Sequence, residues 1–529
     1  MQSSWKSINI PLPTIRATSI QAAMAAVLPI CLLLVLLLAI PLILFKSRRP
    51  APHRGPGGRA VRLPPGPWAL PVIGHLHHLA GALPHRALRD LARRHGPLMM
   101  LRLGELDAVV ASSPDAAREI MKTHDASFAS RPLTSMQQMA YGDAEGLIFA
   151  PYGDAWRQLR KICTVEIFSS RRVQSFRPAR EEELGRLLRS VAAASASSSP
   201  VNLSERISAY VADSTVRAIV GSRFKQRDTY LEMLQEGLKI VPGMTLPDIF
   251  PSSRLVRLLG SVPGRIQRHS QDMKLFMDTI IQEHQENSGP DCDGDKEEDL
   301  LDVLLRLQKE GDSQCPLTTD NIKTVMLDMF GAGSETSATT LQWAMAELIR
   351  NPRVMRKAQD EVRQQLAGHD KVREADLADL RYLGFVIKET LRMHPPAPLL
   401  LPRRCGSPCQ VLGLDVPEGV MVIVNAWAIG MDPAHWEAPE EFAPERFEQN
   451  GRDFKGADFE FVPFGGGRRI CPGMAFGLAH VELALAALLF HFDWELPGGA
   501  AAEDLDMTEE FGVTARLRSD LVVVAVATE

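Results

Sequence analysis

The chain has 529 residues, of which 45% are hydrophobic and 23% are charged, and its formal net charge at pH 7 is -5. This length allows one large domain with a deep interior, and the weakly acidic charge balance argues against a nucleic-acid partner. The 7 cysteines, at positions 31, 163, 292, 315, 405, 409 and 471, are few and scattered. We therefore expect a reducing compartment and no structural disulfides.

The start of the chain predicts a membrane anchor. Residues 22–45 contain no charged side chain, and a helix over this run would span about 36 Å, more than the ~30 Å hydrocarbon core of a bilayer. Basic residues are more frequent after this run than before it. By the positive-inside rule, residues 1–21 are then a lumenal leader, residues 22–45 are the transmembrane anchor, and the rest of the chain is cytoplasmic.

Two other kinds of targeting segment could explain an apolar start of the chain. A cleaved signal peptide has a shorter apolar region and a small-residue cleavage site, and neither is visible here. A transit peptide is the stronger rival, because residues 1–21 contain serines and no acidic residue. A long apolar run directly behind such a segment is not typical of transit peptides, so the anchor remains the interpretation.

Residues 46–74 are first basic and then rich in proline. Proline at this density excludes a helix and favours a stiff, extended segment. We expect a hinge that sets the height and tilt of the following domain, residues 75–529, on the membrane; a plain linker is the alternative.

The first part of that domain predicts local elements. A short helix is expected from Leu88 to Arg94 and a β-hairpin from Leu98 to Val110. The Ala- and Ser-rich residues 191–200 and the acidic residues 286–299 are expected to be surface loops within one domain.

Trp156 and Arg160 lie four residues apart on a predicted helix. This spacing puts both side chains on one face, where they can reach the same carboxylate. The alternative for Arg160 is a solvated surface charge.

A long apolar helix is predicted from Thr324 to Leu348, and the stretch Gly331-Ala332-Gly333-Ser334-Glu335-Thr336 interrupts it. Each glycine costs up to about 1 kcal/mol relative to alanine in a helix. Small residues here let a flat group lie against the helix, and they loosen the backbone ladder so that a bulge or a water can enter. A nucleotide-binding loop is excluded because no strand precedes the glycines and no Gly-Lys-Ser/Thr follows them.

The stretch Phe464 to Gly473 isolates one cysteine behind three consecutive glycines. Pro472 is expected to open an apolar helix, so Cys471 lies at a helix N-terminus, where N–H groups and the helix dipole favour a thiolate that can bind a metal. The alternative is a buried, inert thiol. A zinc site is weaker, since Cys405 and Cys409 have no second close pair.

Taken in order, these motifs resemble the cytochrome P-450 superfamily, and in particular its plant A-type microsomal group. The resemblance runs from the anchor to the C-terminus. It lies in Phe464-x-x-Gly-x-Arg469-x-Cys471-x-Gly473, Ala332-Gly333-x-Glu335-Thr336, Glu389-x-x-Arg392 with Arg446, and Trp156-x-x-x-Arg160.

The resemblance implies a mainly α-helical domain with small β-sheets, behind an N-terminal transmembrane helix, that binds haem b through the Cys471 thiolate. Glu335 and Thr336 would deliver protons on the oxygen-binding side; for Thr336 the alternative is a bond to its own helix. Glu389, Arg392 and Arg446 would form a structural network. The remaining implied cofactor contacts are Trp156, Arg160, Gly333, Arg403, Phe464, Arg469 and Gly473, and the implied substrate-pocket residues are Ala332, Pro398, Leu399, Leu400, Gly512 and Val513.

The implied activity is monooxygenation of a hydrophobic plant specialised metabolite, with O2 and with electrons from NADPH delivered by a separate flavoprotein reductase at the endoplasmic reticulum membrane. A terpenoid is the expected substrate; a phenylpropanoid, an indole or another nitrogenous compound is the alternative. Arg157, Lys161 and Arg468 are candidate docking charges for the reductase or ordinary surface residues. Arg404 departs from the family pattern, in which plant relatives usually have Glu, so the charge pairing there is open.

Two functions without monooxygenation also remain. A member of the same fold can catalyse isomerisation or dehydration without a reductase, which the intact Glu335-Thr336 pair disfavours. A haem-binding protein without turnover is the other.

Overall fold

The computed structural model describes residues 61–134, 137–139, 146–221, 226–240, 245–254, 256, 262–287, 298–311 and 316–528. The predicted leader, the anchor and residues 46–60 of the hinge lie outside this part of the chain. The Pro-rich end of the hinge has no helix up to residue 74, and the carbonyl of Pro65 accepts a hydrogen bond of 2.8 Å from Met100 N.

Helices make up most of the fold. They are α2 (Pro84–His95), α3 (Pro114–Arg118), α5 (Asp154–Ile162), α6 (Ser170–Ser175), α7 (Arg177–Ala196), α8 (Leu203–Val220), α9 (Arg227–Ile240), α10 (Leu246–Ile249), α12 (Val262–Asn287), α13 (Leu300–Glu310), α14 (Thr319–Arg350), α15 (Pro352–Gln365), α16 (Arg381–Met393), α17 (Ala426–Gly430), α18 (Arg446–Asn450) and α19 (Met474–His491). Short helical turns include η2 (Glu119–Thr123), η3 (Asp125–Phe128), η4 (Cys163–Ile167), η5 (Glu374–Asp379) and η6 (Gly467–Arg469).

The strands are short and form small sheets. They are β1 (Leu98–Leu103), β2 (Leu106–Ala111), β3 (Val201–Asn202), β4 (Arg403–Arg404), β5 (Cys409–Val411), β6 (Leu414–Val416), β7 (Met421–Val424), β8 (Phe492–Glu495), β9 (Glu509–Phe511), β10 (Ala515–Leu517) and β11 (Val522–Ala527). The largest sheet has the order β1-β2-β7-β4, in which β2 pairs in parallel with β7 and the other pairs are antiparallel.

The predicted hairpin at 98–110 is confirmed as β1 and β2, in which Leu98 pairs with Ala111. The last strand, β11, pairs with β3 and β8. The predicted helix at 88–94 is also confirmed, and it extends over the whole of α2.

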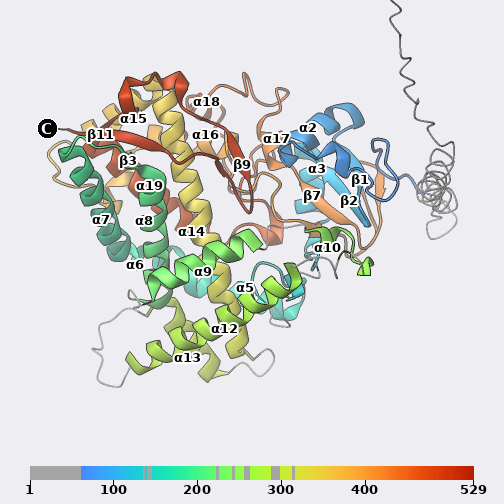
Figure 1. The fold of residues 1–529 in the computed structure, drawn as a ribbon. Helices are drawn as coiled ribbons and strands as arrows, with labels where there is room; N and C mark the ends of the chain where they lie inside the picture. Colours follow the sequence, from blue (N-terminus) through green and yellow to red (C-terminus); the bar gives the residue numbers. More distant parts are fainter. Residues whose placement is uncertain are drawn as a thin grey trace, which may run out of the picture.

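The long helix α14 runs through the helical part of the molecule and packs against α8 and α19 (Figure 1). The strands β1, β2 and β7 lie next to α2, on the other side of α14 from α8 and α19 in this view. A capping box starts α14: the Thr318 hydroxyl accepts from Asn321 N at 3.1 Å, and the Asn321 side chain accepts from Thr318 N. This cap satisfies backbone N–H groups that would otherwise lack partners at the helix start.

Within the described residues, one helix, α19, is long and apolar enough to cross a membrane. It is a helix of the hydrophobic core, with Leu483, Leu485 and Leu488 fully buried. Its apolar character therefore follows from packing inside the domain.

Three expectations were wrong. Residues 191–196 belong to α7 and are not a loop, because alanine favours the helix and Val191 is fully buried in the core. The glycines do not interrupt α14, which is continuous from Thr319 to Arg350. Pro472 does not open the last helix: α19 begins at Met474, with Gly473 at its N-cap.

Candidate active site

A cavity of about 1300 Å³ lies between α14 and the loop that precedes α19. Its volume exceeds the ~300–1,000 Å³ that is typical of a site for one small molecule, so a cofactor and a substrate fit together. Most of the predicted site residues line it: Trp156, Arg160, Ala332, Gly333, Glu335, Thr336, Leu399, Leu400, Arg403, Phe464, Arg469, Cys471, Gly473, Gly512 and Val513.

Cys471 is presented to this cavity by a tight loop. Gly465 and Gly467 have positive φ values of 72° and 66°, which glycine adopts without strain. A Cβ at Gly467 would lie 2.1 Å from the carbonyl oxygen of Met121, so no other residue fits there. Cys471 N donates to Phe464 O at 3.0 Å and closes the loop.

The protein surroundings of Cys471 disfavour a free thiolate. Burial raises the pKa of the Cys471 thiol, and the N–H of Gly473 and the charge of Arg160 offset this only in part. The N–H of Gly473 and the charge of Arg160 favour the thiolate, as expected at a helix start, while burial opposes it. A bound metal ion deprotonates a coordinating thiol, so Cys471 can serve as a thiolate ligand once a metal binds.

Arginines gather at the wall of the same cavity: Arg131, Arg160, Arg403 and Arg469. Burial, followed by the charges of Arg403 and Arg160, lowers the pKa of Arg469 to about 9, and burial lowers the pKa of Arg403 to about 10. Burial and the charges of Arg403 and Arg469 also hold the pKa of Arg131 well below its usual value. Buried cations that repel one another require an anionic partner.

The hydrogen bonds of these arginines leave donors for such a partner. Arg160 donates to Ile470 O at 2.6 Å, Arg403 to Gly466 O at 2.8 Å and Arg469 to Ala129 O at 2.6 Å. The buried nitrogen Arg131 Nε has no hydrogen-bond partner among the described residues; Arg403 Nη1 has none either, but it lies 3.6 Å from Asp125 Oδ1 in an ion pair. Free donors beside an excess of buried positive charge fit the two propionate carboxylates of a haem.

Trp156 has a different partner. Its indole N–H donates to the carbonyl of Leu147 at 2.9 Å, and the guanidinium of Arg469 lies 3.9 Å from the centre of its ring. Trp156 thus supports Arg469 by a cation–π contact, and its own N–H is used within the protein.

On the other side of the cavity, α14 presents Glu335 and Thr336. Thr336 Oγ1 donates to Ala332 O of its own helix at 2.7 Å, which is the geometry of the alternative considered for this residue. Glu335 Oε1 accepts a hydrogen bond of 3.0 Å from Thr514 Oγ1. At Gly333, a Cβ would meet Thr215 at 3.4 Å, an ordinary contact, so the protein alone does not require glycine there.

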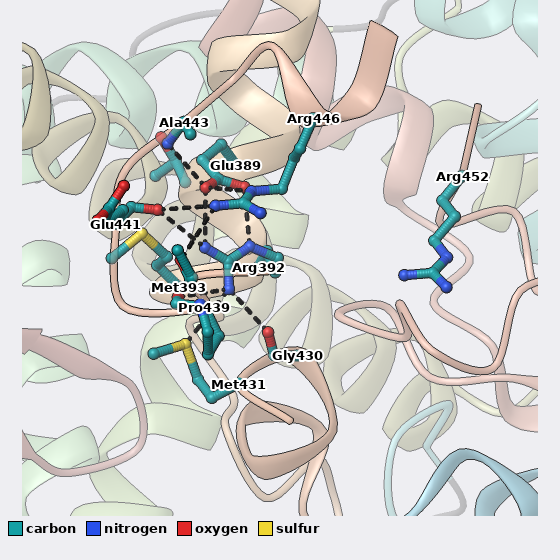
Figure 2. A network of polar contacts seen from close by, with 12 residues as sticks. Glu389, Arg392, Met393, Gly430, Met431, Pro439, Glu441, Ala443, Arg446 and Arg452 are labelled. Atoms are coloured by element: carbon teal, nitrogen blue, oxygen red, sulfur yellow. Dashed lines mark hydrogen bonds and ion pairs between the residues drawn. The ribbon is translucent and has the colours of Figure 1, made fainter. Parts of the chain in front are cut away.

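Glu389, Arg392 and Arg446 form a buried network behind the cavity (Figure 2). Arg392 donates to both carboxylate oxygens of Glu389 at 2.8 Å, and Arg446 Nε donates to the same carboxylate at 2.9 Å. Further bonds of 2.8 Å run from Arg392 to the carbonyls of Gly430 and Pro439. The network ties α16 to the chain segment that precedes the cysteine loop.

The other predicted residues lie away from the cavity or at its surface. Pro398 is buried and accepts from Trp427 N at 3.1 Å, outside the cavity wall. Arg404 pairs through its backbone with β7 and has an exposed side chain. Arg468 forms an ion pair with Asp125 at 2.9 Å, Arg157 pairs with Asp154, and Lys161 is exposed.

The sequence reasoning missed three residues of this site. Arg131 joins the arginine cluster, where it lies under the influence of the charges of Arg403 and Arg469. Asp125 accepts from both the backbone N–H and the side chain of Arg468, at 3.0 and 2.9 Å, and so holds the cysteine loop. Asp328 accepts from Leu147 N and Ile148 N at 2.7 and 3.0 Å. A carboxylate inside an otherwise apolar helix was the available signal for Asp328.

Comparison with known proteins agrees with this geometry. The cytochrome P-450 family matches residues 64–519. Premnaspirodiene oxygenase of Hyoscyamus muticus is 47% identical over 469 residues, which cover 88% of this chain and 93% of that enzyme. Salviol synthase of Salvia pomifera is 48% identical over 462 residues, which cover 87% and 91% of the two chains.

Solved structures share the fold. A zebra fish cytochrome P-450 determined with progesterone has a TM-score of 0.73 and 25% sequence identity, and the match covers 85% of this chain and 100% of that one. The predicted helical fold with small β-sheets is thereby confirmed for the described residues. With a cysteine loop, an arginine cluster and a helix with Glu335-Thr336 around one cavity, the chain belongs to the cytochrome P-450 family of haem-thiolate monooxygenases.

Proposed function

We propose that this protein is a membrane-anchored monooxygenase that oxidises a hydrophobic plant metabolite, with a terpenoid as the substrate class, and that it receives electrons from NADPH through a separate flavoprotein reductase. The observation that carries the proposal is the single cavity that Cys471, the arginines and Glu335-Thr336 share. Relatives support the substrate class: premnaspirodiene oxygenase, dolabradiene monooxygenase and ent-isokaurene C2/C3-hydroxylase, at 46 to 47% identity, are named for unsaturated hydrocarbons, a class that includes the terpenes.

The residues of the cavity wall fit a haem. Cys471 would bind the haem iron through its thiolate, and Arg131, Arg160, Arg403 and Arg469 would hold the propionates. When bound, the haem supplies the iron at which O2 is activated, so that one oxygen atom enters the substrate and the other leaves as water.

The protein orients the substrate, delivers protons and excludes bulk water from the cavity. Leu399, Leu400 and Val513 give the cavity an apolar wall, which orients a hydrophobic substrate and excludes bulk water. The Thr336 hydroxyl and the Glu335 carboxylate lie on consecutive residues of α14 at the same wall. Such groups can pass protons from solvent through ordered water to the reacting oxygen.

The placement at the endoplasmic reticulum membrane, with a cytoplasmic domain, is part of the proposal. An exposed apolar surface supports it: the side chains of Trp68, Val72 and Leu246 are 73%, 61% and 63% exposed. Their segments meet at the β1–β2 turn, where Gly104 N donates to Ile73 O at 3.2 Å and Glu105 N donates to Ile249 O at 3.0 Å. Exposed apolar patches of this kind mark surfaces that contact lipid or protein. Protease added to intact microsomes should digest residues 75–529; protection of the domain would contradict this orientation.

Microsomes that contain the full chain and a reductase test the activity. With NADPH and a panel of terpenoids, mass spectrometry should show products that have gained one oxygen atom. Desmethyl-deoxy-podophyllotoxin synthase of Sinopodophyllum hexandrum is 48% identical to this chain, so the panel also includes phenylpropanoid and nitrogenous compounds. Oxidation of one of these and of no terpenoid would replace the proposed substrate class.

The ligand assignment has a separate spectroscopic test. The reduced protein should give the carbon-monoxide difference band of a thiolate-ligated haem, and Cys471→Ala should lose it. Survival of the band in Cys471→Ala, while Cys163→Ala also keeps it, would contradict the assignment of Cys471; Cys163 is buried outside the cavity wall.

A further inference from the structure

The hydroxyl of Thr514 lies between a catalytic candidate and the substrate side of the cavity. Its Oγ1 donates to Glu335 Oε1 at 3.0 Å, and Thr339 Oγ1 lies 3.4 Å from it. A carboxylate only accepts hydrogen bonds and a hydroxyl can both donate and accept, so the direction of this chain is from Thr339 through Thr514 to Glu335. Thr514 is 3% exposed, so its hydrogen bond to Glu335 lies in the interior and not at the protein surface.

Hydrogen bonds and ion pairs hold the two strands next to Thr514 in place. The adjacent Ala515 is held on both sides, since its carbonyl accepts from Trp343 Nε1 at 3.0 Å and its N–H donates to Pro396 O at 2.9 Å. The other strand of the hairpin, β9, is held by Glu509, which pairs with His85 at 3.0 Å and Arg86 at 2.9 Å. The base of the hairpin is therefore fixed on the protein.

The tip of the same hairpin lines the cavity. Phe511, Gly512 and Val513 line the cavity and precede Thr514 directly. On α14, Glu335, Thr339 and Trp343 are spaced four residues apart and so lie on one helix face, the face that packs against β10. The cavity-lining tip at residues 511–513 and the helix face that carries the Glu335 carboxylate are joined through the Thr514 hydroxyl.

We propose that Thr514 is a positioning residue for Glu335: it fixes the carboxylate at the cavity wall and links its orientation to the substrate-facing tip at residues 511–513. This inference rests on the proposed monooxygenase function, in which Glu335 brings protons to the site. Without the donor at Thr514, the carboxylate can rotate away from the path of the protons, and reducing equivalents are then lost as peroxide. A half-buried carboxylate with one side-chain donor is well placed for such control.

The test compares Thr514→Val, which removes the donor and keeps the shape, with Thr514→Ser, which restores a hydroxyl. Thr390→Val is the matched control, because its hydroxyl is also fully buried but bonds only to Val386 O of its own helix, at 2.9 Å, outside the cavity wall. With a terpene that the wild type oxidises, Thr514→Val should give several-fold less product per NADPH and more peroxide. Thr514→Ser should recover most of the coupling, and Thr390→Val should match the wild type.

A second readout needs no turnover. The infrared band of the Glu335 carboxylate, identified by its loss in Glu335→Gln, should shift in Thr514→Val and return in Thr514→Ser. An unshifted band, or equal coupling in Thr514→Val and the wild type, would overturn the positioning role. If the wild type oxidises no compound of the panel, the proposed substrate class fails, while the infrared comparison still decides the role of Thr514.

Discussion

At the scale of single residues, burial decides what a charge pair contributes. Glu389 and Arg392 are three residues apart on α16 and fully buried, whereas Asp115 and Arg118 have the same spacing on the surface, with side chains 74% and 42% exposed. Loss of one partner from a buried pair leaves an unpaired charge in the interior, which costs about 3–5 kcal/mol. An exposed pair contributes at most about 1 kcal/mol.

Glu389→Ala should therefore lower the free energy of unfolding by about 3–5 kcal/mol. Asp115→Ala is the exposed control and should lower it by less than about 1 kcal/mol. Denaturant unfolding of the detergent-solubilised protein measures both. Equal, small losses in the two variants would show that the network in Figure 2 is not a stabilising one.

The same scale shows what a sequence can and cannot reveal. Glu389 and Arg392 were identified through the family pattern Glu-x-x-Arg, because their spacing alone is that of an ordinary surface pair. Asp125 was not found, because its partner Arg468 lies 343 residues away and only the tertiary fold joins them. Arg131 was missed for the same reason: its charged neighbours, Arg403 on β4 and Arg469 on η6, lie far from it in the sequence.

At the scale of elements, α14 organises the site and carries a second buried carboxylate, Asp328. Burial raises the pKa of Asp328 from 3.8 to about 7, although the N–H groups of Leu147 and Ile148 favour the ionised form. Between these two pH values the folded protein holds a proton that the unfolded chain has released. Stability therefore falls as pH rises through this window and levels off above about pH 7.

Asp328→Asn should remove this dependence. The free energy of unfolding of the wild type, measured relative to Asp328→Asn, should fall by an amount on the order of 4 kcal/mol from pH 4 to pH 7. Asp320→Asn, at the exposed start of the same helix, should keep the slope of the wild type. A difference between wild type and Asp328→Asn that is constant with pH would mean that Asp328 stays ionised in the folded protein.

Elements were predicted well where apolar periodicity is strong and less well at their ends. The helix predicted at 324–348 is real, but its first turn is polar and its start depends on the cap formed by Thr318 and Asn321. The end of α7 looked like a loop because Ala and Ser carry no periodic signal, although Val191 inside it is core. Boundaries follow from caps and tertiary contacts, which a pattern does not contain.

At the scale of the whole molecule, the cavity joins distant parts of the chain: its wall includes Leu76 near the start of the domain and Thr514 near its end. No segment forms this site alone, so a cofactor bound here stabilises the entire fold and not one element. The arginines would make this linkage specific, because two haem carboxylates among them would offset their mutual repulsion.

A thermodynamic cycle over four species measures that linkage: wild type and Arg131→Met, each with and without haem. Haem binding should raise the free energy of unfolding of both proteins. The increase should be about 1.5–3 kcal/mol smaller in Arg131→Met, because a hydrogen bond to a charged group contributes about this much. Arg180→Met is the matched control. Arg180 is also buried, with its side chain 1% exposed, but pairs with Glu374 away from the cavity wall, so its loss should destabilise both forms alike and leave the gain unchanged. An unchanged gain in Arg131→Met would remove this arginine from the cofactor site, whereas a reduced gain in both variants would mean that any loss of buried charge loosens the fold around the haem.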